Sequence, residues 1–243
     1  MNTSTKSAEG HLLNADSSNY DDTAYDKANN TVDICICAII DDQVSVLLIK
    51  RGQPPFEDRW AIPGGYLDIA TKETLDDAAL RELKEETGIK NIHVRQLHTY
   101  SDPKRDPRKR VITTAYYALI SNLTLVTQTI EAKDDAKEYE WFPINDLPDG
   151  LAFDHTDILG DLSDKLAREI TYMPIAFELL GNKFTWTELQ AVYEDILNEE
   201  LVASNFRRKI DIMYKIVPTN QTSEIVKGRP PVLMTYNGVK KQF

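Results

Sequence analysis

The sequence predicts an α+β protein of two domains, a mixed β-sheet flanked by helices and then a winged helix-turn-helix. Strands rich in β-branched residues are interleaved with one amphipathic helix instead of alternating with helices, which favours a mixed sheet. Near the C-terminus, two amphipathic helices precede two short strands, the order of a helix-turn-helix with a wing. A chain of 243 residues with 42% hydrophobic residues can supply cores for both.

The first domain is expected to open with a hairpin that turns at Asp41-Asp42-Gln43, followed later by one helix. Its strands are predicted at residues 32–40, 44–49, 60–62, 92–100, 111–120 and 138–142. The third strand stops at Pro63-Gly64-Gly65. Thr74 and Asp77 form a capping box at the start of the helix, and Gly88 ends it.

The second half of the chain is predicted to be mainly helical. Apolar residues recur every four positions from Ile158 to Ile170 and predict an amphipathic helix. Two more helices are expected near 187–197 and 204–213, and two wing strands near 215–217 and 232–236. We therefore expect a flexible N-terminal segment at 1–30, a first domain at 31–155, a connecting helix at 156–175 and a winged domain at 176–243.

Composition excludes several classes of protein. No apolar run reaches the roughly 18 residues of a membrane span. The Ser-, Asn- and Asp-rich residues 1–30 lack the basic and apolar regions of a signal peptide. We therefore expect a cytoplasmic protein without membrane contact. A disulfide between Cys35 and Cys37, two positions apart in a strand, would be strained, so buried free thiols are expected.

Charge is unevenly distributed along the chain, whose net charge is -11. Residues 183–243 hold 9 Lys+Arg and 7 Asp+Glu, a net charge of +2. Residues 1–182 hold the remaining 19 basic and 32 acidic residues, a net charge of -13. This asymmetry is typical of an acidic domain joined to a nucleic-acid-binding one.

The predicted helix after Thr74 carries a cluster of carboxylates. Glu82, Glu85 and Glu86 lie at i, i+3 and i+4, so they project from one side of the helix and repel one another. Mg²⁺ prefers carboxylate oxygens and bridges to phosphates, so it would relieve this repulsion. The alternative is a solvated acidic helix face. The fixed spacing of Glu73, Arg81 and the three glutamates favours a metal and diphosphate site.

Together with Pro63-Gly64-Gly65 and Gly88, these residues resemble the Nudix box, the helix motif of hydrolases that cleave nucleoside diphosphates linked to other groups. The resemblance implies an α/β/α sandwich. It also implies that Glu82 and Glu86 bind metal, that Glu85 is a ligand or base, and that Arg81 orients them. One feature departs from the family: seven residues, not five, separate Gly65 from Glu73, and Leu67 stands where a glycine is expected. We therefore assign no catalytic set and lean against an enzyme; residual ADP-ribose pyrophosphatase activity would rest on Arg81, Glu82, Glu85 and Glu86.

The second predicted helix of the winged domain carries a basic face opposite its apolar face of Phe206, Ile210 and Met213. Arginine suits the guanine edge and asparagine the adenine edge, whereas lysine suits phosphates. A solvated basic face on a protein-interaction domain is the alternative. The candidate DNA-binding residues are Thr187, Asn205, Arg207, Arg208 and Lys209 on the two helices and Lys227 and Arg229 in the wing.

The C-terminal motifs resemble the winged domain of the Nudix-related (NrtR-like) transcriptional regulators. The similar segments are 184–190, 205–209 and 228–230, with Leu151-Ala152-Phe153-Asp154-His155 at the domain junction. Members of this family repress genes of NAD biosynthesis and salvage and release DNA when they bind ADP-ribose. The resemblance implies a homodimeric repressor on a palindromic operator of double-stranded DNA, with ADP-ribose as effector and a Mg²⁺ ion as a candidate cofactor.

The candidate ligand-binding residues come from the Nudix-like motif and from basic positions near it. They are Arg51, Gly65, Arg81, Glu82, Glu86, Arg105 and Arg108, with Arg105 and Arg108 from a basic loop suited to phosphates. His155 is expected to cap or pack rather than to catalyse. Three alternatives stay open: an active hydrolase of ADP-ribose or a related diphosphate, a regulator of the same build that responds to a pentose, and a protein-binding winged helix.

Overall fold

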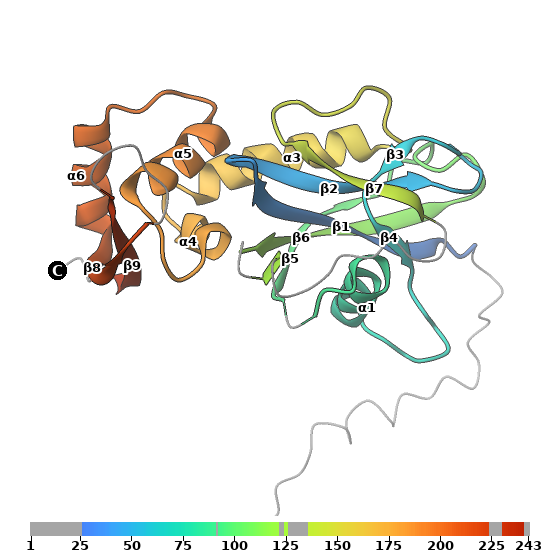
Figure 1. The fold of residues 1–243 in the computed structure, drawn as a ribbon. Coiled ribbons are helices and arrows are strands. Elements are labelled where there is room, and N and C mark those ends of the chain that lie inside the picture. The colour runs from blue at the N-terminus through green and yellow to red at the C-terminus, as the bar shows by residue number, and fades with distance from the viewer. Residues whose placement is uncertain (1–25, 91, 122–123, 126–135, 224–229, 241–243) are drawn as a thin grey trace, which may run out of the picture.

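A computed structural model describes residues 26–90, 92–121, 124–125, 136–223 and 230–240 (Figure 1). Most of the N-terminal segment predicted to be flexible, residues 1–25, lies outside this description. The described chain forms a sheet-containing part and a smaller C-terminal part built of helices and a hairpin. Within the described residues, no helix has the length and apolar character needed to cross a bilayer.

The large sheet is mixed, as predicted. Its strands are β1 (Asn29–Ile40), β2 (Gln43–Arg51), β3 (Trp60–Ala61), β4 (Gly64–Tyr66), β5 (Val94–Tyr100), β6 (Val111–Ile120) and β7 (Ala136–Pro143). The order is β3-β2-β1-β6-β5, with β4 also paired to β1 and β7 to β2. Only the β1–β6 pair is parallel among these described strands. The strand β4 was not predicted, because its Gly-Gly-Tyr sequence carries no β-branched pattern.

The β1–β2 hairpin has the turn that the sequence predicts, although Gln43 already belongs to β2. Asp41 and Asp42 have φ angles of 46° and 64°. Two successive residues with positive φ are typical of the tight hairpin turns that match strand twist, and Asp tolerates this conformation. The tight turn fixes the register of the hairpin, in which Ile40 pairs with Gln43 and Cys37 with Val46.

Helices cover both faces of the sheet, which gives an α/β/α sandwich (Figure 1). Helix α1 (Leu75–Thr87) packs on the face that includes Ile34 and Ile36. Helix α3 (His155–Glu169) packs on the opposite face, which includes Cys35 and Cys37, both buried and free as predicted. Alternation along β1 explains this division, because successive side chains point to opposite faces of a strand.

The ends of helix α1 are those that the sequence predicts. The Thr74 side chain accepts a hydrogen bond from the backbone N–H of Asp77, and the Asp77 carboxylate accepts one from the backbone of Thr74. At the other end Gly88 has φ 74°, the left-handed conformation that favours glycine. The capping box and the glycine thus fix which turn of the helix carries the carboxylate cluster.

The C-terminal part is a winged helix-turn-helix, as predicted. Its elements are α4 (Ile175–Leu180), α5 (Trp186–Leu197), α6 (Ala203–Met213), β8 (Tyr214–Thr222) and β9 (Val232–Val239). Helix α4 was not predicted, since six residues are too few to show a helical period. It completes the core of this domain: the Phe177 ring stacks on Tyr236 with centroids 4.3 Å apart.

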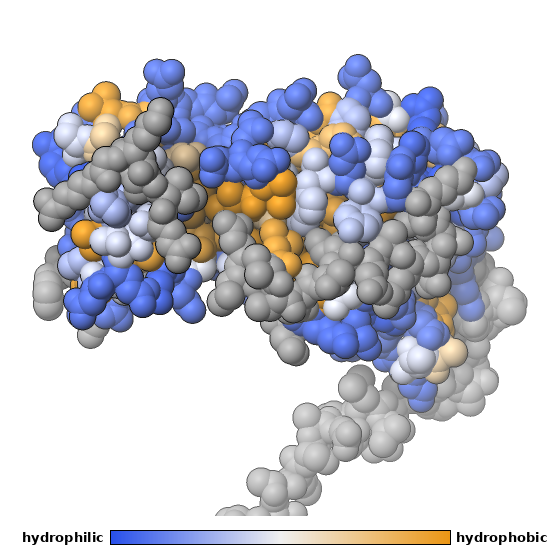
Figure 2. Space-filling model, viewed as in Figure 1, coloured by the Kyte–Doolittle hydropathy of each residue, from blue (hydrophilic) through white to orange (hydrophobic). Residues whose placement is uncertain are grey.

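The two domains share a continuous hydrophobic core. It runs from the α3-facing side of the sheet through α3, α4 and α5 to Phe206 and Ile210 of α6. Polar contacts cross the same junction: Arg95 forms two hydrogen bonds with Glu178, at 2.7 and 3.0 Å. Figure 2 shows a mainly hydrophilic surface in which hydrophobic side chains gather where the two parts meet. The winged domain is therefore packed against the sheet domain.

Candidate functional site

The carboxylate cluster on α1 is organised around the Arg81 guanidinium. Arg81 donates to both Glu73 oxygens at 2.8 and 3.0 Å, to Glu82 Oε1 at 2.7 Å and to Glu85 Oε2 at 2.9 Å. It also donates to the carbonyl oxygen of Tyr66 at 2.9 Å. The predicted orienting role of Arg81 fits this geometry, because one planar cation ties the helix to the strand β4.

Gly65 is placed directly against the Glu82 carboxylate. A Cβ atom built at position 65 would lie 2.1 Å from Glu82 Oε1, so a larger residue would displace the carboxylate. Glu82 is buried at this contact, and burial raises its pKa despite the neighbouring Arg81 charge. The glycine that the sequence singled out therefore admits an acidic side chain to the edge of the sheet.

The loop of extra length before α1 does not displace Glu73. Glu73 Oε1 accepts a hydrogen bond from the backbone N–H of Asp68 at 2.6 Å. The added length forms a turn in which Lys72, with φ 60°, donates its backbone N–H to the carbonyl oxygen of Ile69 at 3.3 Å. The contact between Glu73 and Arg81 is thus kept, and the altered spacing is confined to a surface turn.

Arg81 binds one oxygen of Glu82 and one oxygen of Glu85, and the second oxygen of each carboxylate lies outside these contacts. Among the residues that the structure describes, no group of three or more His, Cys, Asp or Glu side chains is arranged to hold a metal. Metal binding by Glu82 and Glu86 stays a prediction.

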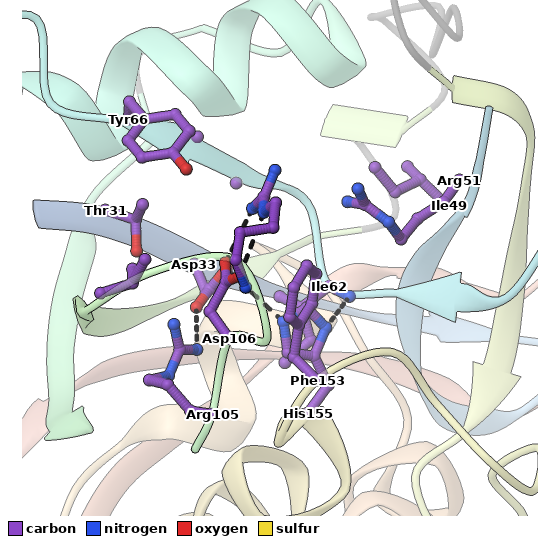
Figure 3. Close-up of a pocket in the computed structure, with 14 residues that line it drawn as sticks. Thr31, Asp33, Ile49, Arg51, Ile62, Tyr66, Arg105, Asp106, Phe153 and His155 are labelled. Carbon is purple, nitrogen blue, oxygen red and sulfur yellow. Dashed lines mark hydrogen bonds and ion pairs between the residues drawn. The ribbon is translucent and has the colours of Figure 1, made fainter. Parts of the chain in front are cut away.

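A pocket of about 210 Å³ opens beside β4, between the sheet, the basic loop and the segment at the start of α3 (Figure 3). Four predicted ligand residues line it: Arg51, Gly65, Arg105 and Arg108. Arg81, Glu82 and Glu86 do not line it, although Glu82 contacts Gly65. The lining residues that the sequence did not assign to ligand binding are Thr31, Asp33, Ile49, Ile62, Gly64, Tyr66, Asp106, Val111, Phe153 and His155.

Arg105 is buried beneath the pocket and anchors the basic loop. It donates to both Asp154 oxygens at 2.7 and 2.9 Å and to Asp33 Oδ2 at 3.4 Å. Asp33 also accepts from the Thr113 hydroxyl at 2.7 Å, yet burial raises its pKa to about 6. With two carboxylates already bound, Arg105 is suited to holding the loop against the start of α3, and its contact with phosphate stays a prediction.

His155 has the packing role that the sequence predicts. It is buried, and its Nδ1 accepts a hydrogen bond from the backbone N–H of Ile62 at 2.8 Å. Burial lowers the pKa of His155 to about 3, so the ring is neutral near pH 7. It is not a helix cap, because α3 begins at His155 and Asp154 holds the cap position without a side-chain bond.

The basic face of α6 is exposed as predicted. Phe206 and Ile210 are buried, whereas Asn205, Arg208 and Lys209 lie in solvent. The Arg207 guanidinium lies over the Trp186 ring, 5.4 Å from its centroid, which links α6 to the start of α5. Thr187, also predicted to contact DNA, is exposed in the first turn of α5. Lys227 and Arg229 of the wing lie outside the described residues.

Comparison with known families matches both parts of this geometry. The model of the NUDIX domain matches residues 30–162, and that of the NrtR DNA-binding winged helix domain matches residues 176–235. The chain belongs to the Nudix family. Its Nudix domain is followed by an NrtR-type winged helix, and residues 163–175 lie between the two matches.

Two curated relatives, one a repressor and the other a hydrolase, are similar to this chain. The ADPR-responsive transcriptional repressor NtrR of Acinetobacter baylyi is 34% identical over 218 residues, which are 89% of this chain and 85% of the relative. An ADP-ribose pyrophosphatase of Methanocaldococcus jannaschii is 41% identical over 128 residues, which are 53% of this chain and 71% of the relative. The repressor match thus spans both domains, and the hydrolase match spans about half of this chain.

Solved structures of NrtR from Shewanella oneidensis are also similar to this chain. The NrtR complex with a 27mer DNA has a TM-score of 0.72 at 31% identity, covering 85% of this chain and 93% of that chain. The NUDIX domain of the same protein in complex with ADP-ribose has a TM-score of 0.54 at 30% identity, covering 66% of this chain and 99% of that chain. The fold of this Nudix protein over both domains is therefore similar to that of NrtR in its complex with DNA.

Proposed function

We propose that this protein is a transcriptional repressor that binds DNA through its winged helix and releases it when its Nudix domain binds ADP-ribose. The observation that carries the proposal is the joint match of both domains, over 85% of the chain, to a regulator crystallised with DNA. The exposed basic face of α6 and the arginine-lined pocket support the proposal as candidate surfaces for DNA and for the ligand.

Each domain has a defined part in this proposal. The N-terminal half of α6 enters the major groove, where Asn205 and Arg208 read base edges and Lys209 contacts phosphate. The pocket binds the diphosphate of ADP-ribose next to the arginines of its lining. ADP-ribose acts as inducer because it binds the DNA-free arrangement more tightly than the DNA-bound one.

The remaining features follow from this function. We infer a homodimer on a palindromic operator, since two winged helices must read two half-sites in register. The regulated genes are those of NAD biosynthesis and salvage, for which ADP-ribose reports NAD breakdown. A repressor acts where DNA lies, so we place the protein in the cytoplasm.

The strongest second candidate is a hydrolase of ADP-ribose. It is supported by the match to the ADP-ribose pyrophosphatase and by the retained residues Glu73, Arg81, Glu82, Glu85 and Glu86. Arg81 binds Glu82 through Oε1 alone, so Mg²⁺ at Glu82 and Glu86 would have the second Glu82 oxygen as a ligand. A pentose effector is less well supported, because a bare sugar offers no anion to the arginines of the pocket.

Fluorescence anisotropy with a labelled duplex from upstream of NAD-synthesis genes tests the proposal. Salt is fixed and random competitor DNA is present, because unspecific binding falls steeply with salt. ADP-ribose is then titrated, and the sample is analysed for AMP and ribose 5-phosphate. We expect tight specific binding that is lost while ADP-ribose stays intact. Consumption of ADP-ribose without specific DNA binding would instead establish the hydrolase.

A further inference from the structure

Phe153 is an unusual residue in the lining of the pocket. It belongs to the junction segment between β7 and α3, and its φ is 54°. A bulky side chain at positive φ costs energy, and such strain is concentrated at ligand-binding positions. The backbone is held there by its neighbours: Ala152 donates to the carbonyl oxygen of Trp60 at 2.9 Å and accepts from His155 at 3.2 Å. The fold therefore fixes an aromatic ring at this place.

The ring rests on a small apolar cluster separate from the main cores. Ile49, Ala61 and Ala152 form its buried part, and Phe56 and Phe153 pack against them. The Phe56 ring meets Phe153 edge-on, with centroids 4.9 Å apart and an interplanar angle of 64°. Phe153 thus packs against the apolar cluster and against the Phe56 ring, and it is half-buried where it lines the pocket.

Two guanidinium groups lie next to the same ring. The Arg51 Cζ is 5.0 Å from the Phe153 centroid, and the Arg108 Cζ is 5.9 Å away. The Pro55 carbonyl oxygen accepts from Arg51 Nε at 2.9 Å, and Asp106 accepts two bonds from Arg108 at 2.7 and 3.0 Å. These bonds orient both cations toward a common region of the pocket, where Figure 3 shows Arg51 beside Phe153.

A nucleotide would use this arrangement in a definite way. A cation over an aromatic ring is a weaker contact than a guanidinium bound to phosphate by charge-assisted hydrogen bonds. A diphosphate would therefore draw Arg51 from the ring, whereas Arg108 would stay bound to Asp106 and offer its remaining N–H groups. The freed ring face would then suit a flat base, which stacks on aromatic side chains whatever its hydrogen-bonding edge.

Tyr66 is a second aromatic residue in the pocket lining, and it is the competing stacking surface. It is 41% exposed, and Lys109 Nζ lies 5.0 Å from its centroid. Among the described contacts, however, it has neither a supporting aromatic ring nor a place in a hydrophobic cluster. Phe153 is the better supported ring.

We propose that Phe153 is the stacking surface for the base of a nucleoside diphosphate ligand, with Arg51 and Arg108 beside the diphosphate. The proposal rests on the proposed function and adds how the base is recognised. A ligand that contains a base gains from Phe153, whereas a ligand with only phosphates does not. That difference separates stacking from a general effect on the shape of the pocket.

The test uses the full-length protein and its variants Phe153→Leu, Phe153→Tyr and Tyr66→Leu. Affinities for ADP-ribose, ADP and inorganic pyrophosphate are measured by calorimetry, and quenching of the fluorescent 1,N⁶-etheno-ADP-ribose reports stacking directly. Leucine keeps apolar volume but offers no ring face. We expect Phe153→Leu to lower the affinity for ADP-ribose and for ADP by between about fivefold and 150-fold. Its affinity for pyrophosphate should stay unchanged, and the quenching should be lost. Phe153→Tyr should retain both.

Each other outcome has a distinct meaning. Equal losses for ADP-ribose and pyrophosphate in Phe153→Leu, or a large loss with Tyr66→Leu alone, would overturn the stacking role of Phe153. Failure of the wild-type protein to bind ADP-ribose would refute the proposed function instead. Thermal unfolding and DNA binding of each variant verify that it is folded.

Discussion

At the scale of single residues, Arg81 shows how one side chain can hold a motif together. Its guanidinium neutralises Glu82, whose side chain is 9% exposed, and reaches Glu85, whose side chain is 49% exposed. Removing one partner of a fully buried ion pair costs about 3–5 kcal/mol. Because the Arg81 side chain is 30% exposed, we expect Arg81→Gln to lower the free energy of unfolding by about 2–3 kcal/mol.

The matched control is Glu85→Gln, which changes an exposed partner of the same guanidinium. Exposed ion pairs contribute less than about 1 kcal/mol, so this variant should unfold nearly as the wild type does. Urea unfolding followed by circular dichroism measures both. Equal destabilisation of the two variants would show that the burial of Glu73 and Glu82, the two less exposed partners of Arg81, has no energetic consequence.

Asp33 and His155 form a pair whose titrations oppose each other. The pKa of Asp33 is raised to about 6, so the stability it contributes is present at low pH and is lost as pH rises from about 4 to 6. The pKa of His155 is lowered to about 3, so its contribution is present above about pH 6.5 and is lost as pH falls toward 3. Between about pH 4 and 6 the two effects largely cancel.

Asp33→Asn should make the effect of His155 on the pH dependence of stability measurable. Without the opposing carboxylate, we expect the free energy of unfolding to fall, relative to wild type, by roughly 1.4 kcal/mol per pH unit between pH 6 and 4. Urea unfolding at half-unit pH intervals measures the difference. Asp42→Asn, the same change in the exposed hairpin turn, should give a curve parallel to wild type. Parallel curves for both variants would mean that Asp33 has no raised pKa.

At the scale of elements, the helices and long strands could be predicted from the sequence because their signals are local. The capping box at Thr74, the glycine stop at Gly88 and the apolar period of α3 each act within a few residues. The elements that were missed, β4 and α4, are three and six residues long. They exist because they pair with β1 or fill the winged-domain core, which no local pattern records.

The same distinction explains which site residues could be predicted. The carboxylate cluster lies on one helix, so its spacing is visible in the sequence. The pocket instead brings together residues far apart in the chain: Arg105 binds Asp33 and Asp154, which are 72 and 49 positions away. Phe153 was visible only as part of a junction segment. Its positive φ was the missing signal, and backbone strain cannot be read from residue type.

Helix α6 carries the prediction for DNA recognition, which rests on the proposed function. If Arg208 reads a guanine, Arg208→Ala should weaken specific binding by about 1–3 kcal/mol and relax the preference at one base pair. Anisotropy on the operator and on single-base variants measures this. Lys209→Ala should weaken binding to all duplexes alike and reduce the salt dependence of that binding. A uniform loss with Arg208→Ala would show that Arg208 contacts only phosphate.

The β1–β2 hairpin offers a route between the two sites. Its turn meets α5: Asp195 Oδ2 accepts from the backbone N–H of Val44 at 2.5 Å, and Asn145 donates to Asp195 at 2.9 and 3.2 Å. The same strands carry Asp33 and Arg51 into the pocket. A rigid hairpin can thus transmit a change in the pocket to the helix that supports α6.

We therefore expect Asp195→Ala to weaken coupling rather than either binding event. The factor by which saturating ADP-ribose lowers DNA affinity should shrink about twofold to 30-fold, because single coupling residues contribute about 0.5–2 kcal/mol. Asp164→Ala removes the same charge from an exposed site on α3 and should leave this factor unchanged. DNA anisotropy with and without ADP-ribose gives the factor for each protein. An unchanged factor in Asp195→Ala would place the coupling elsewhere.

At the scale of the whole molecule, the separation of charge constrains how the protein approaches DNA. Residues 1–182 carry a net charge of -13, whereas residues 183–243 carry +2. The acidic domain is repelled by phosphates, so the winged domain must face the duplex and the Nudix domain must point away. A single winged helix offers a small contact, and two copies on two half-sites would supply the specificity that a repressor needs.

The proposed homodimer can be tested through the geometry of the operator. If two winged helices are held in one rigid dimer, the half-sites must lie on the same face of the duplex, about one helical turn or a multiple apart. Inserting 5 base pairs between them rotates one half-site by about half a turn, and inserting 10 restores the face. We expect specific anisotropy binding to collapse with 5 inserted pairs and to recover in part with 10. Equal affinity for all spacings would mean that each winged helix binds independently, and ADP-ribose would then have to act within one chain, through the hairpin and α5.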